Sequence, residues 1–227
     1  MPLSAVRRHR WDVSPAEARA LQASLAAEVE TGDRFGEIAT IAGIDIGFEE
    51  GGRITRAAIA VLASPGLELI EQSVARRPTD FPYVPGLLSF RETPAALAVL
   101  SRLRRTPDLL VCDGHGFAHP RRFGLACHLG WLLDVPCIGV AKTRLIGTFD
   151  APVAERGGWS PLLDRRQVIG AALRTRTGVA PVFVSTGHRV SLTSAIDLTL
   201  ALAPRYRLPE TTRQAHRLAS APAPSSS

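Results

Sequence analysis

The chain contains few cysteines, few aromatic residues and no long hydrophobic run, and each shortage excludes a class of protein. Its three cysteines, Cys112, Cys127 and Cys137, are an odd number at spacings that match no zinc motif. We therefore expect reduced core thiols and no disulfide framework. No apolar stretch approaches the ~20 residues of a transmembrane helix, and the basic N-terminus lacks the apolar segment of a signal peptide. These features predict a cytoplasmic protein with no membrane partner.

Lysine is scarcer than cysteine. Lysine and arginine together number 27, and every one of these side chains is arginine except Lys142. A position that keeps a compact ammonium in so arginine-rich a chain indicates a specific need, with chance placement as the alternative. The net charge of +6 favours a polyanion such as nucleic acid, with an ordinary basic surface as the alternative. Aromatic residues make up only 6%, which leaves few side chains for stacking on bases.

The length and patterning predict one domain over residues 1–218 and a disordered, low-complexity tail over residues 219–227. Ser14, Pro15 and Glu17 form a capping box with proline at the first helical position, so a helix should run to about residue 30. The next helical region should reach about residue 105, and Thr93 and Pro94 could begin a fresh helix within it. Further helices are expected over residues 122–133, 191–202 and 209–218. Strands are expected over residues 38–48, 53–63, 67–77, 107–113, 136–141, 167–175 and 181–185.

This order of elements predicts a three-strand antiparallel meander followed by βαβ units. Parallel strands buried on both faces read as short apolar runs, as residues 107–113 and 136–141 do. The fold class is therefore α/β, a mixed sheet with helices on both faces in the manner of a ribonuclease H-like fold.

Two aspartates occupy unusual places in this sheet. Asp113 ends an apolar run and is followed by glycines, histidines and arginines, a pattern that suits a metal ion meeting a phosphate. An ordinary turn after a strand is the alternative. Asp45 shares one face of its strand with Gly43 and Gly47, and we expect these glycines to leave room for a ligand to approach the carboxylate.

Two carboxylates on adjacent strands predict an oxygen-ligand site for Mg²⁺ or Mn²⁺. Glu92 is the best third ligand in the sequence, although a solvated helix residue paired with an arginine is an open alternative. Such a site suits phosphoryl transfer, in which Lys142 could neutralise charge that develops on the phosphate. His216 shares a helix face with Arg213 and Arg217, so this trio could contact phosphates, relay a proton or simply form a solvated basic face.

Six segments of the chain resemble the endonuclease V family, the nucleases that act at deoxyinosine. They occur in the family's order between about Trp11 and Arg217, and the second and third together are highly specific. The segments are IAGIDIGF, FPYVPGLLSFRE, DGHGFAHPRRFGLACHLG, GVAKTRLIG, PVFVSTGHRVSL and LPETTRQAH.

The resemblance implies a Mg²⁺-dependent DNA-repair endonuclease that hydrolyses the second phosphodiester 3′ to deoxyinosine and leaves a 3′-hydroxyl and a 5′-phosphate. It implies that Asp45, Glu92 and Asp113 bind the metal, for which Mn²⁺ can substitute, and that Lys142 and His216 complete the catalytic group. A stiff wedge that separates the strands would be formed by Pro82, Tyr83, Val84 and Pro85. The pocket for the base would be formed by Gly86, Leu88, Gly114, His119 and Leu125. Contacts to the DNA backbone are expected from Arg121, Arg122, Arg144, His188 and Arg213.

Two residues depart from the pattern: His115 stands where the family commonly has Gln, and Thr186 where it commonly has Pro. We expect both to lie near the path of the DNA and to affect strand preference more than catalysis. Three other functions are open at this point: cleavage of inosine-containing single-stranded RNA, binding of deaminated nucleic acid without catalysis, and structure-selective cleavage such as junction resolution. The partner is nucleic acid in each case, and we expect a monomer.

Overall fold

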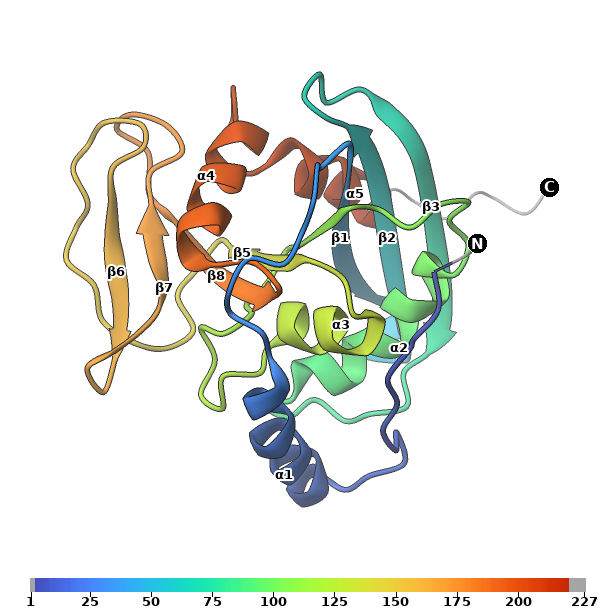
Figure 1. Cartoon of the computed structure of the whole chain (residues 1–227). Coiled ribbons are helices and arrows are strands. Elements are labelled where there is room, and N and C mark those ends of the chain that lie inside the picture. Colours follow the sequence, from blue (N-terminus) through green and yellow to red (C-terminus); the bar gives the residue numbers. More distant parts are fainter. Residues whose placement is uncertain (1–2, 221–227) are drawn as a thin grey trace.

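The computed structural model describes residues 3–220, and its strands form one mixed eight-stranded sheet (Figure 1). The order across the sheet is β3-β2-β1-β4-β5-β8-β7-β6. The pairs β1/β4 and β4/β5 are parallel, and the other neighbouring pairs are antiparallel. The strands are β1 (Thr40–Glu49), β2 (Ile54–Ala63), β3 (Leu69–Pro78), β4 (Leu109–Cys112), β5 (Cys137–Ala141), β6 (Trp159–Asp164), β7 (Gln167–Leu173) and β8 (Val182–His188).

Helices cover both faces of this sheet, which confirms the predicted fold class. Helices α2 (Leu88–Leu100) and α3 (Leu125–Leu133) enclose a core with one face of β1, β2 and β4. On the other face, α4 (Leu192–Leu202) packs on β5, β7 and β8, while α5 (Glu210–Ser220) packs on β1 and β2. Helix α1 (Pro15–Leu25) begins at the predicted capping box, in which Ser14 and Glu17 bond each other's backbone N–H groups. The short 3₁₀ helices are η1 (Ala26–Glu28) and η2 (Glu50–Gly52).

The meander and the βαβ unit follow the sequence prediction, whereas three details differ. Helix α2 runs through Pro94 without a fresh start. Strand β6 was not predicted because Pro161 interrupts its apolar pattern, and the structure accommodates this proline in the outermost strand, where a missing N–H costs least. Helix α5 extends to Ser220, so residues 219 and 220 are helical; the rest of the expected tail, residues 221–227, lies outside the described residues.

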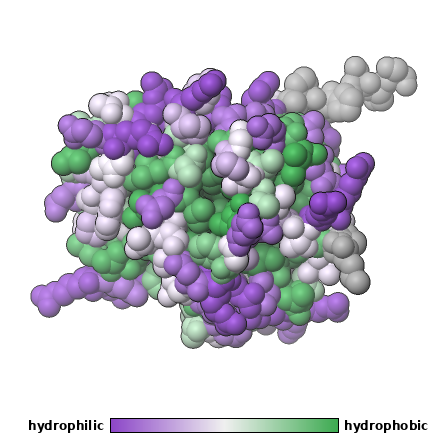
Figure 2. Space-filling model, turned by 45° about the horizontal axis from the view of Figure 1, so that its top comes forward, coloured by the Kyte–Doolittle hydropathy of each residue, from purple (hydrophilic) through white to green (hydrophobic). Residues whose placement is uncertain are grey.

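The three cysteines are free and buried, as expected. No helix within residues 3–220 is both long and apolar enough to cross a membrane. The face of the molecule turned toward the viewer in Figure 2 has hydrophobic residues near its centre and hydrophilic residues around them.

Gly43 and Gly47 differ in purpose, although both share a strand face with Asp45. A Cβ on Gly43 would lie 2.2 Å from the backbone carbonyl atoms of Thr211, so this glycine lets α5 approach β1. A Cβ on Gly47 would meet no atom within 4 Å. The expectation that both glycines make room for a ligand is thus wrong for Gly43, where the space is filled by a helix that carries His216.

This difference predicts that Gly43→Ala destabilises the protein and Gly47→Ala does not. The added methyl at position 43 must push α5 outward, and overpacking of this kind costs about 1–3 kcal/mol. We expect a fall in Tm of roughly 5 °C for Gly43→Ala, measured by thermal denaturation. Gly47→Ala adds the same methyl to the same strand and is the matched control; equal Tm values for the two variants would contradict the assigned packing.

Candidate active site

Asp45 and Asp113 are brought together by the parallel pairing of β1 and β4. The Asp113 N–H donates to the carbonyl oxygen of Ile44 at 3.0 Å, which continues the ladder one step beyond the end of β4. Because Cys112 is in register with Ile44, Asp113 lies level with Asp45 on the neighbouring strand. The two carboxyl side chains are 10% and 12% exposed, so both are largely removed from water.

Each aspartate has one cationic or basic neighbour from a distant part of the chain. Lys142, the residue after β5, places its Nζ 2.6 Å from Asp113 Oδ2. His216, on α5, places its Nδ1 2.7 Å from Asp45 Oδ2. One ligand atom from each of Asp45, Asp113 and His216 lies within 4.8 Å of the others. The only lysine in the chain and the histidine singled out in α5 thus meet the two strand aspartates.

Glu92 approaches this group from α2 but does not belong to the set of atoms within 4.8 Å. Its side chain is buried, and burial together with the charges of Asp45 and Asp113 raises the pKa of Glu92 to about 8. The alternative of a solvated helix residue is therefore wrong, because Glu92 is only 8% exposed. Burial likewise raises the pKa of Asp113, against the lowering effect of Lys142.

The donor set fits a hard divalent cation. Burial and the neighbouring carboxylates raise the pKa values of Glu92 and Asp113, so these groups are unfavourable as anions unless positive charge is added. Lys142, which is 38% exposed, supplies some of it. Carboxylate oxygens are the ligands that Mg²⁺ and Mn²⁺ prefer, so Asp45, Asp113 and Glu92 could hold such an ion.

A cavity of about 220 Å³ opens directly beside the acids. Glu92 and Asp113 form part of its wall, and Tyr83 stands at it with 71% of its surface exposed. All five residues predicted to form a base pocket line this cavity, as do three of the four wedge residues. The residues concerned are Gly86, Leu88, Gly114, His119 and Leu125 for the pocket and Tyr83, Val84 and Pro85 for the wedge.

One wall of the cavity is fixed by hydrogen bonds to the Gly86 carbonyl. Gly86 has a φ of +77°, a conformation that glycine adopts without strain. Its oxygen accepts from Arg121 at 2.6 Å and lies 3.0 Å from Nε2 of His119. Burial, with the charge of Arg121, lowers the pKa of His119 to about 4, so this ring is neutral near pH 7. The base-sized space is thus enclosed largely by backbone, aliphatic groups and an uncharged imidazole.

Comparison with known proteins identifies the family. The sequence profile of endonuclease V matches residues 23–217. An endonuclease V of Roseiflexus sp. (strain RS-1) is 57% identical over 210 residues, which cover 92% of this chain and 94% of the relative. The chain belongs to the endonuclease V family. It is accordingly a nuclease, as its relatives are named.

Solved structures agree with this assignment. The endonuclease V of Streptomyces avermitilis superimposes with a TM-score of 0.88 at 46% identity, covering 92% of each chain. The endonuclease V of Ciona intestinalis, crystallised with DNA that contains an inosine, superimposes with a TM-score of 0.76 at 23% identity, covering 90% of this chain and 95% of that one. The second likeness shows the shared fold.

The arginines expected to contact DNA are largely engaged within this endonuclease V chain. Arg121 also donates to Gln22, and Arg122 forms an ion pair with Asp164 at 2.7 Å. Arg213 pairs with Glu210 and lies over the ring of Tyr206 at 3.4 Å. Arg144 is exposed and donates to the Gly147 carbonyl. Arg144 is the most exposed of the four.

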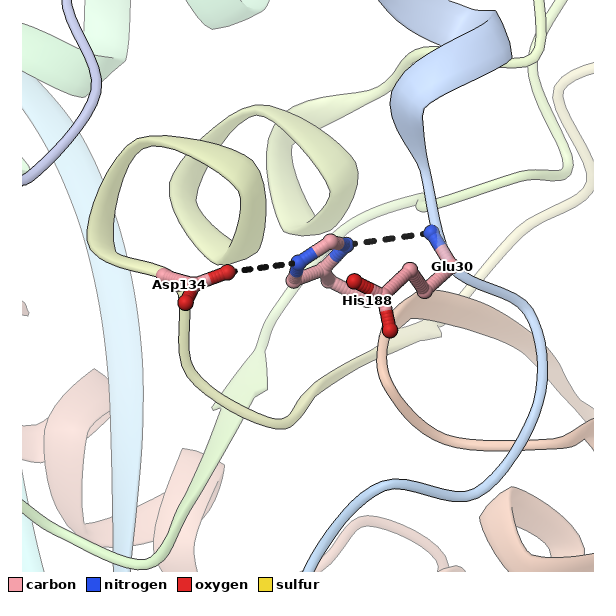
Figure 3. A group of neighbouring side chains, drawn as sticks. All are labelled: Glu30, Asp134 and His188. Atoms are coloured by element: carbon pink, nitrogen blue, oxygen red, sulfur yellow. Dashed lines mark hydrogen bonds and ion pairs between the residues drawn. The ribbon is translucent and has the colours of Figure 1, made fainter.

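His188 cannot contact a nucleic-acid backbone, and this prediction is corrected. Its side chain is fully buried, with Nδ1 accepting from the Glu30 N–H at 3.2 Å and Nε2 3.4 Å from Asp134 Oδ1 (Figure 3). Arg189 pairs with both acids, and Arg7 pairs with Asp134. Although Glu30, Asp134 and His188 have the spacing of a metal site, these arginines already supply the compensating charge. The cluster therefore fastens residue 30 to the end of α3.

The two departures from the family pattern lie in different places. Thr186 is buried, and its carbonyl oxygen accepts from the Phe117 N–H, so its side chain is not available for direct contact with DNA. His115 does line the cavity. Four lining residues were not predicted as pocket residues: Ser89, His115, Gly124 and Leu145. His115 and Gly124 could have been suspected only because they lie in or near the DGHG segment. Nothing in the sequence around Leu145 indicates a place in the pocket.

Proposed function

We propose that this chain is a Mg²⁺-dependent endonuclease of DNA repair that recognises deoxyinosine and hydrolyses the second phosphodiester on its 3′ side. The observation that supports this most directly is the position of the acidic group beside a cavity of base size. A strand whose deaminated base occupies the cavity brings its own 3′ phosphates past Asp45 and Asp113. The distance between the base pocket and the acids then determines which phosphodiester, counted from the recognised base, is cleaved.

The cavity suits a hypoxanthine base that has left the helical stack. Polar backbone groups at Gly86 and Gly114 can face the edges of the base, while Leu88 and Leu125 supply apolar contact. Tyr83, exposed between two prolines, has the rigidity and the aromatic face to fill the space that the base vacates. These features support a strand-separating role for Pro82, Tyr83, Val84 and Pro85.

The catalytic acids support the phosphodiester step. Water adds to phosphorus, the bond from phosphorus to the 3′ oxygen breaks, and the leaving oxygen takes up a proton to give a 3′-hydroxyl and a 5′-phosphate. Mg²⁺, or Mn²⁺ in its place, held by Asp45, Glu92 and Asp113, would supply Lewis-acid stabilisation of the phosphate and of the leaving oxygen. Lys142, fixed by Asp113 yet 38% exposed, is placed to neutralise charge on the phosphate.

His216 is held in one tautomer by its contact with Asp45. Because an ionised carboxylate only accepts, Nδ1 of His216 carries the proton of their 2.7 Å bond. Nε2 is then the free lone pair, and the ring is 54% exposed. This arrangement lets His216 accept a proton from the attacking water, with Asp45 stabilising the resulting charge.

The test is cleavage of end-labelled strands that contain a single inosine. We expect one cut, at the second phosphodiester 3′ to the inosine, dependent on Mg²⁺ or Mn²⁺ and lost in EDTA. A strand with adenine in place of inosine is the control, and a matched RNA strand separates deoxyinosine from inosine recognition through the 2′-hydroxyl. Equal cutting of the adenine strand, or tight binding with no cutting in either metal, would overturn the proposal.

A further inference from the structure

The turn between β6 and β7 has an unusual composition for its geometry. Asp164 pairs directly with Gln167, so the turn consists of two residues, Arg165 and Arg166. Their φ values are +50° and +66°. A two-residue hairpin with both residues in the left-handed region favours Asn-Gly or Asp-Gly, because other side chains are strained there. A pair of arginines is therefore a poor choice for this turn on grounds of stability.

Neither side chain has a partner within the described chain that would compensate for this strain. Arg165 and Arg166 are exposed, and among residues 3–220 neither guanidinium forms a hydrogen bond or an ion pair. The nearest carboxylate in sequence, Asp164, already pairs with Arg122 at 2.7 Å. Three guanidinium groups around the turn thus share one acidic side chain, and the tip carries unbalanced positive charge.

Arg122 connects this turn to the cavity. Its guanidinium donates to Asp164 and to Gln167, the two residues that flank the turn, and also to the carbonyl oxygen of His119. His119 lines the cavity beside the acids. Arg122 itself has a φ of +57°. The hairpin is therefore held at a fixed position relative to the cavity wall, and Figure 1 shows its turn projecting from the body of the molecule at the lower left.

We propose that the Arg165-Arg166 turn binds the phosphodiester backbone of the nucleic acid outside the cavity. Strained backbone that persists in an exposed turn points to a function for the side chains that it presents. Two free guanidiniums at the tip of a fixed hairpin can each contact a phosphate, and guanidinium matches phosphate geometry with two donors. Such contacts position the strand and carry no base specificity. The inference extends the proposed function by adding a phosphate-binding surface outside the cavity.

The turn allows a test in which charge and stability change in opposite directions. R165N/R166G removes both charges and supplies the residues that the turn favours. We expect Tm to be equal or higher, while Kd for a duplex oligonucleotide rises about tenfold and the slope of log Kd against log salt falls by about 1 to 2. Binding is measured by fluorescence anisotropy in EDTA, so that no cleavage occurs.

Two further variants isolate the position and the charge. R104A/R105A also removes two exposed arginines, in a segment that bonds Glu71 of β3, the strand at the opposite edge of the sheet from β6. R165K/R166K keeps the charge of the turn. We expect the first to leave the salt slope unchanged and the second to retain most of it. A slope that is unchanged in R165N/R166G, or lowered equally in R104A/R105A, would overturn the proposal.

Strands with and without inosine distinguish this inference from the proposed function. A phosphate contact does not depend on the base, so R165N/R166G should lower the salt slope equally on both strands. If the unaltered protein showed no preference for inosine, the deoxyinosine assignment would fail while the result for the turn could still be measured.

Discussion

Asp45→Asn is expected to reduce cleavage of an inosine-containing strand by about 10³-fold or more. Substitution of a residue that only orients a metal ligand commonly lowers metal affinity or activity by 10–100-fold. Asp45 should matter more, because it offers its own oxygen to the site and also holds His216. The amide is isosteric, so the fold should persist. The measurement is single-turnover cleavage in saturating Mg²⁺, with binding in EDTA followed in parallel.

Binding distinguishes this loss from a general failure of the variant. Removal of a carboxylate beside a polyanion weakens repulsion, so affinity in EDTA should be equal or higher. Asp197→Asn, which neutralises an exposed carboxylate on α4, is the matched control and should cleave normally. Cleavage within tenfold of the unaltered protein by Asp45→Asn would exclude the proposed role of this side chain.

The parts of the fold that could be predicted are those whose pattern is local. Alternation around Asp45 in β1 and the apolar runs of β2, β4 and β5 each identify a strand from a few residues. Strand β6 was not predicted because it contains Pro161, and proline is acceptable in a strand only at a sheet edge. Whether a strand lies at an edge is decided by the assembled sheet and not by the local sequence. Pro94 was similarly ambiguous, because local preference cannot decide whether packing carries a helix through a proline.

The site was predictable where strands impose its geometry and less so elsewhere. Asp45 and Asp113 meet because two strands pair, an outcome that follows from their positions on buried strands. The meeting of His216 with Asp45 depends on the close approach of α5 at Gly43, over a separation of 171 residues. The prediction for His188 failed. This residue, at the end of a strand, was expected to contact DNA, but it is buried because residue 30, far away in the sequence, packs against it.

Glu92→Gln is expected to stabilise the protein at high pH in EDTA. Burial and the charges of Asp45 and Asp113 raise the pKa of Glu92 from 4.5 to about 8. Between these values the folded state holds a proton that the unfolded state has released, so the stability associated with Glu92 is full below pH 4.5 and declines as the pH rises through about 8. A shift of this size corresponds to roughly 5 kcal/mol, and Gln, which does not ionise, removes the decline.

The measurement is Tm as a function of pH for both proteins. Near pH 5 the two should melt together, whereas at pH 9 in EDTA the Gln variant should melt about 10–20 °C higher. Glu37→Gln, at an exposed carboxylate, is the control and should follow the unaltered protein at both pH values. Parallel curves for Glu92→Gln and the unaltered protein would show that Glu92 is not the buried, proton-binding group described above.

Addition of Mg²⁺ should reverse this order. An ion that binds the folded state alone stabilises it in proportion to its affinity, and the site with three carboxylates binds more strongly than the site with two. At pH 9 the Tm of the unaltered protein should therefore rise more steeply with Mg²⁺ concentration than that of Glu92→Gln. The same side chain that weakens the metal-free fold would then strengthen the loaded one, which is the behaviour expected of a metal ligand and not of a structural acid.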